Sequence, residues 1–350
     1  MIGAPRCGKT TIFEALTNTP EGRHFTTKGT HHLGTVKVPD DRLAGLRDLF
    51  QPKKYTPAEV TFVDVAIPAA PEGTNPLAQL TTFLGEADAF VLVVQAFGEV
   101  DFRGKPLDPV AQMESVLLEM TVSDLEKTER RLEKIEHERQ RGLKFSELEL
   151  GALTKCKAQL EAGQALRSLG FPTEEEKMLR TFQFLTMKPV LAVANVSEDR
   201  LDGAGLDPLR EACAKDRVDL MVFCGALEAE MAQLDPDAQE AFLKDYGLSE
   251  PARTRLIQAA YKLMDLVSFF TVGEDEVRAW TIRRGTPAVS AAGKIHTDLE
   301  KGFIRAEVVN WDELLKAGSL SACQKNATLR LEGKSYGVQD GDVMHIRFNA

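Results

Sequence analysis

The sequence lacks three features that would mark a secreted, metal-binding or membrane protein. Its five cysteines are scattered without a CxxC pair, which favours a reduced interior over a disulfide framework. No spacing matches a metal-ligand motif, and the adjacent His31 and His32 are interpreted as loop residues. No signal peptide is evident, and no apolar run approaches the ~20 residues of a membrane helix. We therefore expect a cytoplasmic protein with no membrane partner.

The chain also lacks an excess of positive charge, because 43 basic residues stand against 53 acidic ones. The formal net charge is −10, and the stretch from Val267 to Ala350 is balanced at 11 basic and 11 acidic residues, so the preceding residues carry the whole excess. An acidic chain is a poor general binder of nucleic acid, so any RNA contact needs a local patch. The neutral C-terminal part offers a candidate groove near Trp280, although a solvated β-surface explains the same residues equally well. The basic residues concerned are Arg278, Arg283, Arg284, Lys294, Lys301 and Arg305.

Buried strands are predicted in the first part and beyond residue 177. The runs Val60–Val65, Phe90–Ala96 and Pro189–Asn195 are short, apolar and rich in β-branched residues. Helical stretches separate them, which indicates βαβ units and a mainly parallel sheet. The fold class expected for this part is α/β.

The middle of the chain predicts helices instead of strands. From Met113 to about Gly170 the sequence is highly charged, and its apolar residues keep a three-to-four spacing that Gly142 interrupts. We expect a helical hairpin inserted into the α/β domain; a solvated hairpin without any partner is the alternative. A third helix is expected from Thr173, with Thr173 and Glu176 forming a capping box.

The last part of the chain is again rich in predicted strands. We expect a small α+β module of about 85 residues, within the usual size of a domain. Together these patterns predict a nucleotide-binding domain over 1–110 and 177–265, a hairpin over 111–176 and a C-terminal domain over 266–350. The predicted C-terminal strands are Arg278–Arg283, Phe303–Val309, Ala327–Leu331 and Val343–Phe348.

A phosphate-binding loop is the strongest chemical signal. The residues match GxxxxGK[ST] without a mismatch, and a helix is predicted directly after them. The two glycines permit a close approach of the backbone, whose N–H groups form an anion nest at a helix N-terminus. Lys9 supplies a cation for the β- and γ-phosphates, Thr10 a hydroxyl for Mg²⁺ and Thr11 a hydroxyl near the α-phosphate. The predicted binding residues are Gly3, Ala4, Pro5, Arg6, Cys7, Gly8, Lys9, Thr10 and Thr11.

Asp64 supplies a carboxylate as a second ligand for Mg²⁺. It ends an apolar strand, where α/β folds place ligand-binding groups, and it is predicted to bind Mg²⁺ with Thr10. Lys9, Thr10 and Asp64 are the predicted catalytic residues. Only Met1 and Ile2 precede Gly3, so either the natural start lies upstream or the sheet lacks most of a core strand. We favour an upstream start.

Three stretches resemble one known family, the Obg-like ATPases (YchF). They are Lys188–Asp199, Ser268–Val308 and Leu329–Asn349, and the resemblance extends over nearly the whole chain. It implies a diverged member with a translation-factor-type P-loop GTPase fold, a coiled-coil antenna and a small, β-grasp-like TGS domain. It also implies ATP in preference to GTP, and the ribosome or ribosomal RNA as partner through the TGS domain and antenna. A monomer is expected.

The base-recognition residues depart from those of ordinary GTPases. Where these have Asn-Lys-x-Asp, the chain has Asn195 to Glu198, which resembles the family's NxxE variant. The lost Asp removes the guanine-selective contact, while Asn195 is predicted to bond a purine edge. The resemblance places Ala226 in the next base-side loop. Asn195, Glu198 and Ala226 complete the predicted ATP site.

Other departures affect hydrolysis. Ile67 replaces the switch glycine, and Pro68 follows it. The first switch, around Phe25 to Thr27, is shortened. No Gln or His stands in an obvious position to orient water. Because one lost donor commonly costs about 10²–10³ in rate, we expect ATP binding with slow turnover.

Three readings of function follow. The leading one is an ATP-binding regulatory protein whose nucleotide state controls binding to a large partner. The second is a diverged, non-catalytic interaction protein with weak or no nucleotide binding. The third, a true GTPase, is disfavoured because the guanine-reading Asp is missing.

Overall fold

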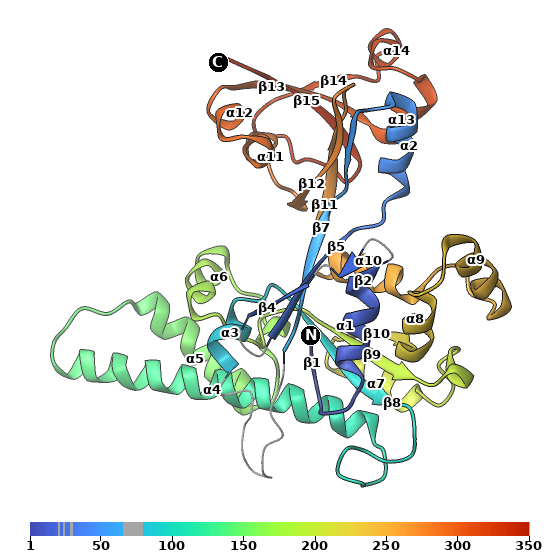
Figure 1. Ribbon diagram of the computed structural model, residues 1–350. Helices are drawn as coiled ribbons and strands as arrows, with labels where there is room; N and C mark the ends of the chain where they lie inside the picture. The colour runs from blue at the N-terminus through green and yellow to red at the C-terminus, as the bar shows by residue number, and fades with distance from the viewer. Residues whose placement is uncertain (20–21, 24, 29–30, 66–79, 350) are drawn as a thin grey trace. The chain divides into compact units, whose positions relative to one another are not determined.

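The computed structural model describes residues 1–19, 22–23, 25–28, 31–65 and 80–349 (Figure 1). The chain divides into two compact units. One comprises Met1–Gly34 and Phe62–Arg253, and the other Thr35–Thr61 and Thr254–Ala350. Each unit has its own sheet and its own apolar core.

A parallel four-stranded sheet forms the centre of the first unit. Its order is β1-β8-β9-β10. Every residue of β8 and β9 is buried, as expected of strands covered on both faces. The apolar runs predicted around residues 90–96 and 189–195 are therefore confirmed as parallel strands. The strands are β1 (Ile2–Gly3), β8 (Phe90–Ala96), β9 (Val190–Val196) and β10 (Asp219–Phe223).

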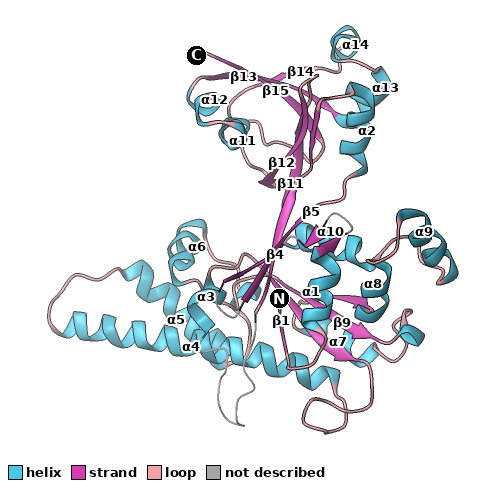
Figure 2. Cartoon of the chain, in the orientation of Figure 1, coloured by secondary structure: helices cyan, strands magenta, loops and turns pink. Residues whose placement is uncertain are grey.

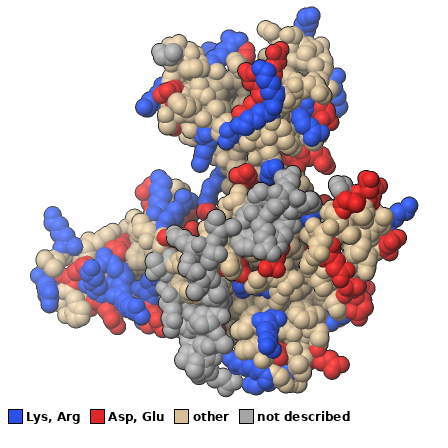
Figure 3. Space-filling view, viewed as in Figure 1, with Lys and Arg blue, Asp and Glu red and all other residues tan. Residues whose placement is uncertain are grey.

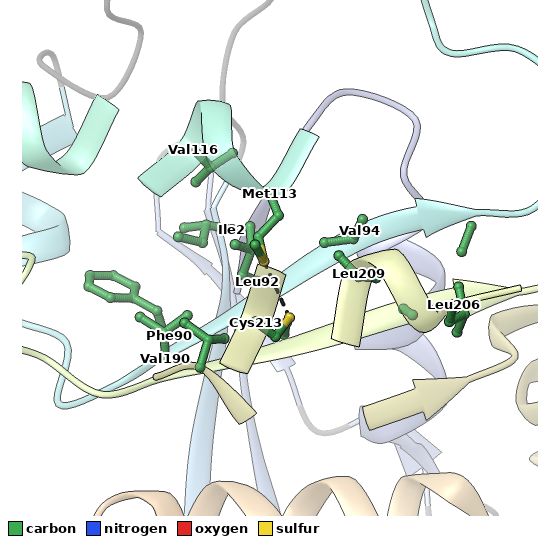
Figure 4. Close-up of a cluster of buried hydrophobic side chains, with 14 of the residues drawn as sticks. Ile2, Phe90, Leu92, Val94, Met113, Val116, Val190, Leu206, Leu209 and Cys213 are labelled. Atoms are coloured by element: carbon green, nitrogen blue, oxygen red, sulfur yellow. Dashed lines mark hydrogen bonds between the residues drawn. The ribbon is translucent and has the colours of Figure 1, made fainter. Parts of the chain in front are cut away.

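Helices pack on the sheet and bury its alternate side chains. Met113 and Val116 of helix α4 (Pro109–Gln140) and Cys213 of α7 (Asp207–Lys215) lie against Leu92 and Val190 of the strands (Figure 4). On the other side of the sheet from α4, helices α1 and α8 pack together (Figure 1). The helices and 3₁₀ turns of this unit outside the hairpin are α1 (Lys9–Thr17), α3 (Thr81–Gly85), η4 (Glu198–Arg200), α7 (Asp207–Lys215), α8 (Gly225–Met231) and α9 (Pro236–Asp245).

A long helical hairpin projects from this unit (Figure 2). It consists of α4 (Pro109–Gln140) and α5 (Glu147–Glu161), whose facing sides bury an apolar seam. The Arg131 guanidinium pairs with Glu149 at 2.7 Å, and Lys157 pairs with Glu129 at 3.0 Å, so ion pairs join the two helices. Basic and acidic side chains alternate over its surface (Figure 3).

The hairpin returns to the sheet through short helices. These are η2 (Leu166–Ser168), α6 (Thr173–Leu179) and η3 (Arg180–Phe182). The predicted capping box is wrong, because Pro172 is the N-cap of α6 and no side chain caps it. Thr173 lies one position too late, already inside the helix.

Two small sheets lie outside the central sheet of the first unit. β2 (Asn18–Thr19) pairs with β3 (Gly22–Arg23), and a three-stranded sheet has the order β4-β5-β7. The strands of the three-stranded sheet are β4 (Phe25–Lys28), β5 (His31–Lys37) and β7 (Glu59–Asp64). The boundary between the two units falls within β5, after Gly34, and within β7, before Phe62.

A mixed six-stranded sheet organises the second unit. Its order is β14-β13-β15-β11-β12-β6, and α11 packs its alanines into the core. Three of the four strands predicted in this part are present, whereas the one predicted over Ala327–Leu331 is displaced and shares only two residues with β14. The strands are β6 (Lys54–Thr56), β11 (Leu266–Thr271), β12 (Glu276–Arg283), β13 (Phe303–Asn310), β14 (Arg330–Glu332) and β15 (Asp342–Phe348). The helices are α2 (Asp41–Phe50), α10 (Ala252–Leu263), α11 (Ala288–Ile295), α12 (Thr297–Lys301), α13 (Trp311–Ala317) and α14 (Leu320–Lys325).

Residues 35–61 belong to this second unit, whereas the sequence analysis grouped them with the nucleotide-binding part. β6 adds an edge strand beside β12. Arg42 of α2 pairs with Asp40 at 2.8 Å and Asp340 at 2.9 Å, and it lies over the ring of Phe270. The fold is thus an α/β P-loop fold with an inserted helical hairpin and a small C-terminal α+β part.

Within these described residues, no helix combines the length and the apolar composition needed to cross a membrane.

Candidate nucleotide-binding site

The glycine-rich loop joins β1 to α1 and lines a pocket of about 490 Å³. Arg6 (φ 62°) and Gly8 (φ 87°) both take left-handed backbone angles, and α1 begins directly afterwards at Lys9. This places N–H groups of the loop and helix around one cavity, which is the geometry of a phosphate nest. The pocket is lined by Gly3, Ala4, Pro5, Arg6, Cys7, Gly8, Lys9, Thr10, Thr11, His32, Asp64 and Phe97.

Gly3 and Gly8 are required by close contacts, and Gly8 also by its left-handed backbone angle. A Cβ on Gly3 would lie 2.5 Å from the carbonyl oxygen of Val93. A Cβ on Gly8 would lie 2.1 Å from Nδ2 of Asn195. Real Cβ atoms do not approach so closely, so any side chain at either position would distort the loop.

Lys9, Thr10 and Asp64 meet at one end of the pocket. Asp64 is only 3% exposed, and it accepts hydrogen bonds from the Lys9 ammonium and from Oγ1 of Thr10, the latter at 2.8 Å. The lysine therefore neutralises a carboxylate that would otherwise be buried and unpaired. This cluster joins the first turn of α1 to the end of β7.

The same cluster has the chemistry of a Mg²⁺ site. A hydroxyl and a carboxylate are hard oxygen ligands, and Mg²⁺ is commonly held by one or two protein oxygens together with phosphates and waters. Among the described residues no group of three or more His, Cys, Asp or Glu could hold a metal ion. The adjacent oxygens of Thr10 and Asp64 fit a Mg²⁺ ion for which phosphates and waters would supply the remaining ligands.

Asn195 anchors the loop. Its side chain is 4% exposed; Nδ2 donates to the carbonyl of Cys7 at 3.0 Å, and Oδ1 accepts from the Gly225 N–H at 2.9 Å. This amide thus ties the phosphate loop to the start of α8, where the exposed Ala226 follows. Both polar atoms of the Asn195 amide already bond the protein, so the predicted purine contact requires a further hydrogen bond from the same amide.

Glu198 does not lie with the pocket residues. It is exposed at the start of η4 and accepts a hydrogen bond from the Tyr246 hydroxyl at 3.3 Å. The structure thus brings the phosphate loop, Asp64 and Asn195 together and leaves Glu198 outside this cluster.

Cys7 is held inside the loop as a thiol. It is 1% exposed, and burial raises the pKa of its thiol to about 11. The Cys7 side chain therefore packs the loop, and its carbonyl, which accepts from Asn195, is the polar group it contributes.

Two pocket residues were missed by the sequence analysis. His32, interpreted as a loop residue, lies in β5 and lines the pocket, and Phe97 lines it directly after β8. Neither belongs to a motif, and only the fold brings them to the loop. Ile67 and Pro68 lie outside the described residues, as do the side chains around Thr26.

Comparisons with known proteins identify the family. A family model for the C-terminal domain of YchF GTPases, described as a protein of unknown function (DUF933), matches residues 266–349. The "Ribosome-binding ATPase YchF" of Bacillus subtilis is 37% identical over 361 residues, covering 100% of this chain and 98% of the relative. The protein of the same name from Escherichia coli O157:H7 is 37% identical over 357 residues, with the same coverage. The chain belongs to the YchF family.

The solved YchF GTPase of Schizosaccharomyces pombe supports the same assignment. It has a TM-score of 0.82 and 27% identity, covering 99% of this chain and 96% of that chain. The resemblance to YchF drawn from the sequence is therefore confirmed, together with the P-loop fold.

Proposed function

We propose that this YchF protein binds ATP with Mg²⁺, hydrolyses it slowly, and uses its nucleotide state to control binding to the ribosome. The observation that carries the proposal is the cluster of Lys9, Thr10 and Asp64 beside a strictly glycine-dependent loop. Each of its groups has a task in binding a Mg²⁺–nucleoside triphosphate.

The residues of the loop divide this task. The loop amides receive the phosphate oxygens, and Lys9 exchanges its hydrogen bond to Asp64 for the β- and γ-phosphates. Thr10 and Asp64 are then free to hold Mg²⁺, which neutralises phosphate charge when bound. Arg6, exposed in the loop and lining the pocket, adds a second cation.

The proposed preference for adenine depends on Glu198, which stands where guanine-binding proteins have an aspartate. Here Glu198 is exposed and hydrogen-bonded to Tyr246. It therefore does not offer the buried carboxylate that reads the guanine N1 and N2 positions. Asn195 keeps the loop in place for either purine.

Slow turnover is expected because the switch glycine is replaced. Ile67 stands where a switch glycine would contact the γ-phosphate. We therefore expect a rate below ~1 s⁻¹, at the low end for enzymes. ATP would act as a long-lived ligand that marks one state of the protein.

The ribosome is proposed as the partner because relatives similar over the whole chain are named ribosome-binding ATPases. A ribosome-bound role would place the protein in the cytoplasm. The chain is expected to act as a monomer, and the TGS part and hairpin supply the contacting surfaces.

Co-sedimentation with ribosomes tests the regulatory part. The protein should pellet with ribosomes differently when it is loaded with a non-hydrolysable ATP analogue than with ADP. Lys9→Ala should remove that difference, and Lys244→Ala, at an exposed position of α9 outside the proposed contact surfaces, is the matched control for a lost lysine charge. Equal pelleting in both nucleotide states would overturn the regulatory role.

A further inference from the structure

His32 is a pocket residue that comes from outside the phosphate loop. Thr10 and Asp64 lie together, and they would hold the Mg²⁺ that neutralises charge on the terminal phosphates. His32 is carried by β5, whose neighbour β7 ends in Asp64. Both His32 and Asp64 line the same pocket.

The imidazole of His32 lies near an aromatic ring of α1. Its ring centroid lies 6.3 Å from that of Phe13, which is buried in α1. The side chains of Thr35 and Thr61 contact each other at 2.9 Å, which ties β5 to β7 a short distance along the strand. His32 therefore lies on the strand beside the one that ends in Asp64, with its ring near the helix that follows the phosphate loop.

Among the residues that the structure describes, the other pocket side chains leave one task unfilled. Lys9 and Arg6 are cations that can only donate, Asp64 and Thr10 fit the metal, and Cys7 is buried. Hydrolysis also needs a group that orients the attacking water. An imidazole can accept a hydrogen bond from water through one nitrogen while it donates through the other.

We infer that His32 contacts and orients the water that attacks the terminal phosphate of ATP, an inference that rests on the proposed function. In this step the water oxygen bonds to the γ-phosphorus as the bond from that phosphorus to the β–γ bridging oxygen breaks. The bridging oxygen leaves with ADP, and the water proton passes through His32 to solvent. The products are ADP, inorganic phosphate and a proton.

The test separates hydrolysis from binding. Single-turnover hydrolysis and the Kd for ATP are measured for the full-length protein and for His32→Asn, with His31→Asn as the matched control. His31 is the neighbouring imidazole but stacks on Phe83 at 4.3 Å. His32→Asn should slow hydrolysis about 10²-fold, the lower end for a lost acid–base group, with the Kd changed less than about twofold. His31→Asn should hydrolyse ATP as the wild type does.

Chemical rescue distinguishes a catalytic role from a structural one. Added imidazole should restore part of the rate of His32→Ala, because a free ring can enter the space and contact the same water. If His32→Asn does not fold, His32→Gln takes its place. Unchanged hydrolysis in a folded variant, a loss of ATP binding equal to the loss of rate, or no rescue by imidazole would overturn the inference.

The wild-type protein separates this inference from the proposed function. Tight ATP binding without measurable hydrolysis would overturn the role of His32 and leave nucleotide binding standing. Failure to bind ATP at all would overturn both.

Discussion

At the scale of single residues, the site depends on a buried charge pair and on two glycines. Lys9 and Asp64 have side chains only 11% and 4% exposed, so the ammonium and carboxylate stabilise each other where water cannot. The sequence predicted these residues because GxxxxGK[ST] is a local motif. It could not predict His32, whose position beside the loop depends on how β5 packs against α1.

Removing the lysine should destabilise the nucleotide-free protein as well as weaken ATP binding. Lys9→Ala leaves Asp64 buried and unpaired, which commonly costs about 3–5 kcal/mol. Denaturant unfolding checks this. The double variant Lys9→Ala, Asp64→Asn should recover much of the loss, because no unpaired charge remains. Equal stability of Lys9→Ala and wild type would contradict the pairing.

Gly8→Ala should disrupt the loop through two effects that act together. The left-handed backbone costs a non-glycine residue about 1–2 kcal/mol, and the new Cβ would meet Nδ2 of Asn195. We expect a lower midpoint of unfolding and a large loss of ATP affinity. Gly142→Ala is the control, since it shares the left-handed angle but has open space around it and lies on the hairpin. Wild-type ATP affinity in Gly8→Ala would contradict the contact with Asn195.

The cysteines give a simple measure of native packing. All five are free and buried, and burial raises the pKa of Cys7 to about 11. Since the thiolate is the reactive form, none should react quickly with a thiol reagent at pH 8. All five should react once the protein is unfolded. Rapid labelling of Cys7 in the native protein would show that the loop opens.

At the scale of elements, the hairpin is fixed to its unit by a buried carboxylate. Asp124 of α4 accepts hydrogen bonds from the Leu185 N–H at 3.0 Å, the Thr186 N–H at 2.7 Å and the Thr186 hydroxyl at 2.7 Å. Burial raises the pKa of Asp124, and these hydrogen bonds oppose that shift. The carboxylate thus ties the middle of α4 to the segment that leads into β9.

Asp124→Ala should be strongly destabilising. It leaves two buried backbone N–H groups without an acceptor, and each such loss costs about 1–3 kcal/mol. Glu133→Ala, an exposed acid on the same helix, should change the free energy of unfolding by less than about 0.5 kcal/mol. Thermal unfolding measures both. Similar melting temperatures for the two variants would mean that Asp124 does not anchor the hairpin.

Elements were predictable where their own residues determine them. The residues of β8 and β9 are apolar at nearly every position, and this pattern alone predicts buried strands. β6 could not be predicted, because Lys54 to Thr56 are exposed or half-buried and form a strand only by pairing with the distant β12. The capping prediction failed because Pro172, next to Thr173, occupies the cap position.

At the scale of the whole molecule, two units share one chain, and residues 35–61 belong to the second unit although the residues on both sides of them belong to the first. Arg42 joins that segment to Asp340 near the C-terminus, a contact between residues far apart in the sequence. Such long-range pairing leaves no local signal in the sequence, so this boundary could not be predicted from the sequence alone. The function proposed for the molecule depends on the first unit binding an adenine nucleotide.

Titration calorimetry with ATP and GTP in Mg²⁺ tests that claim most directly. We predict micromolar binding of ATP, much weaker binding of GTP because Glu198 cannot replace the guanine-reading aspartate, and loss of ATP binding in Lys9→Ala. Lys244→Ala should bind as the wild type does. Absence of binding to either nucleotide would contradict the account and favour a non-catalytic interaction protein, and GTP binding as tight as ATP binding would contradict the adenine preference.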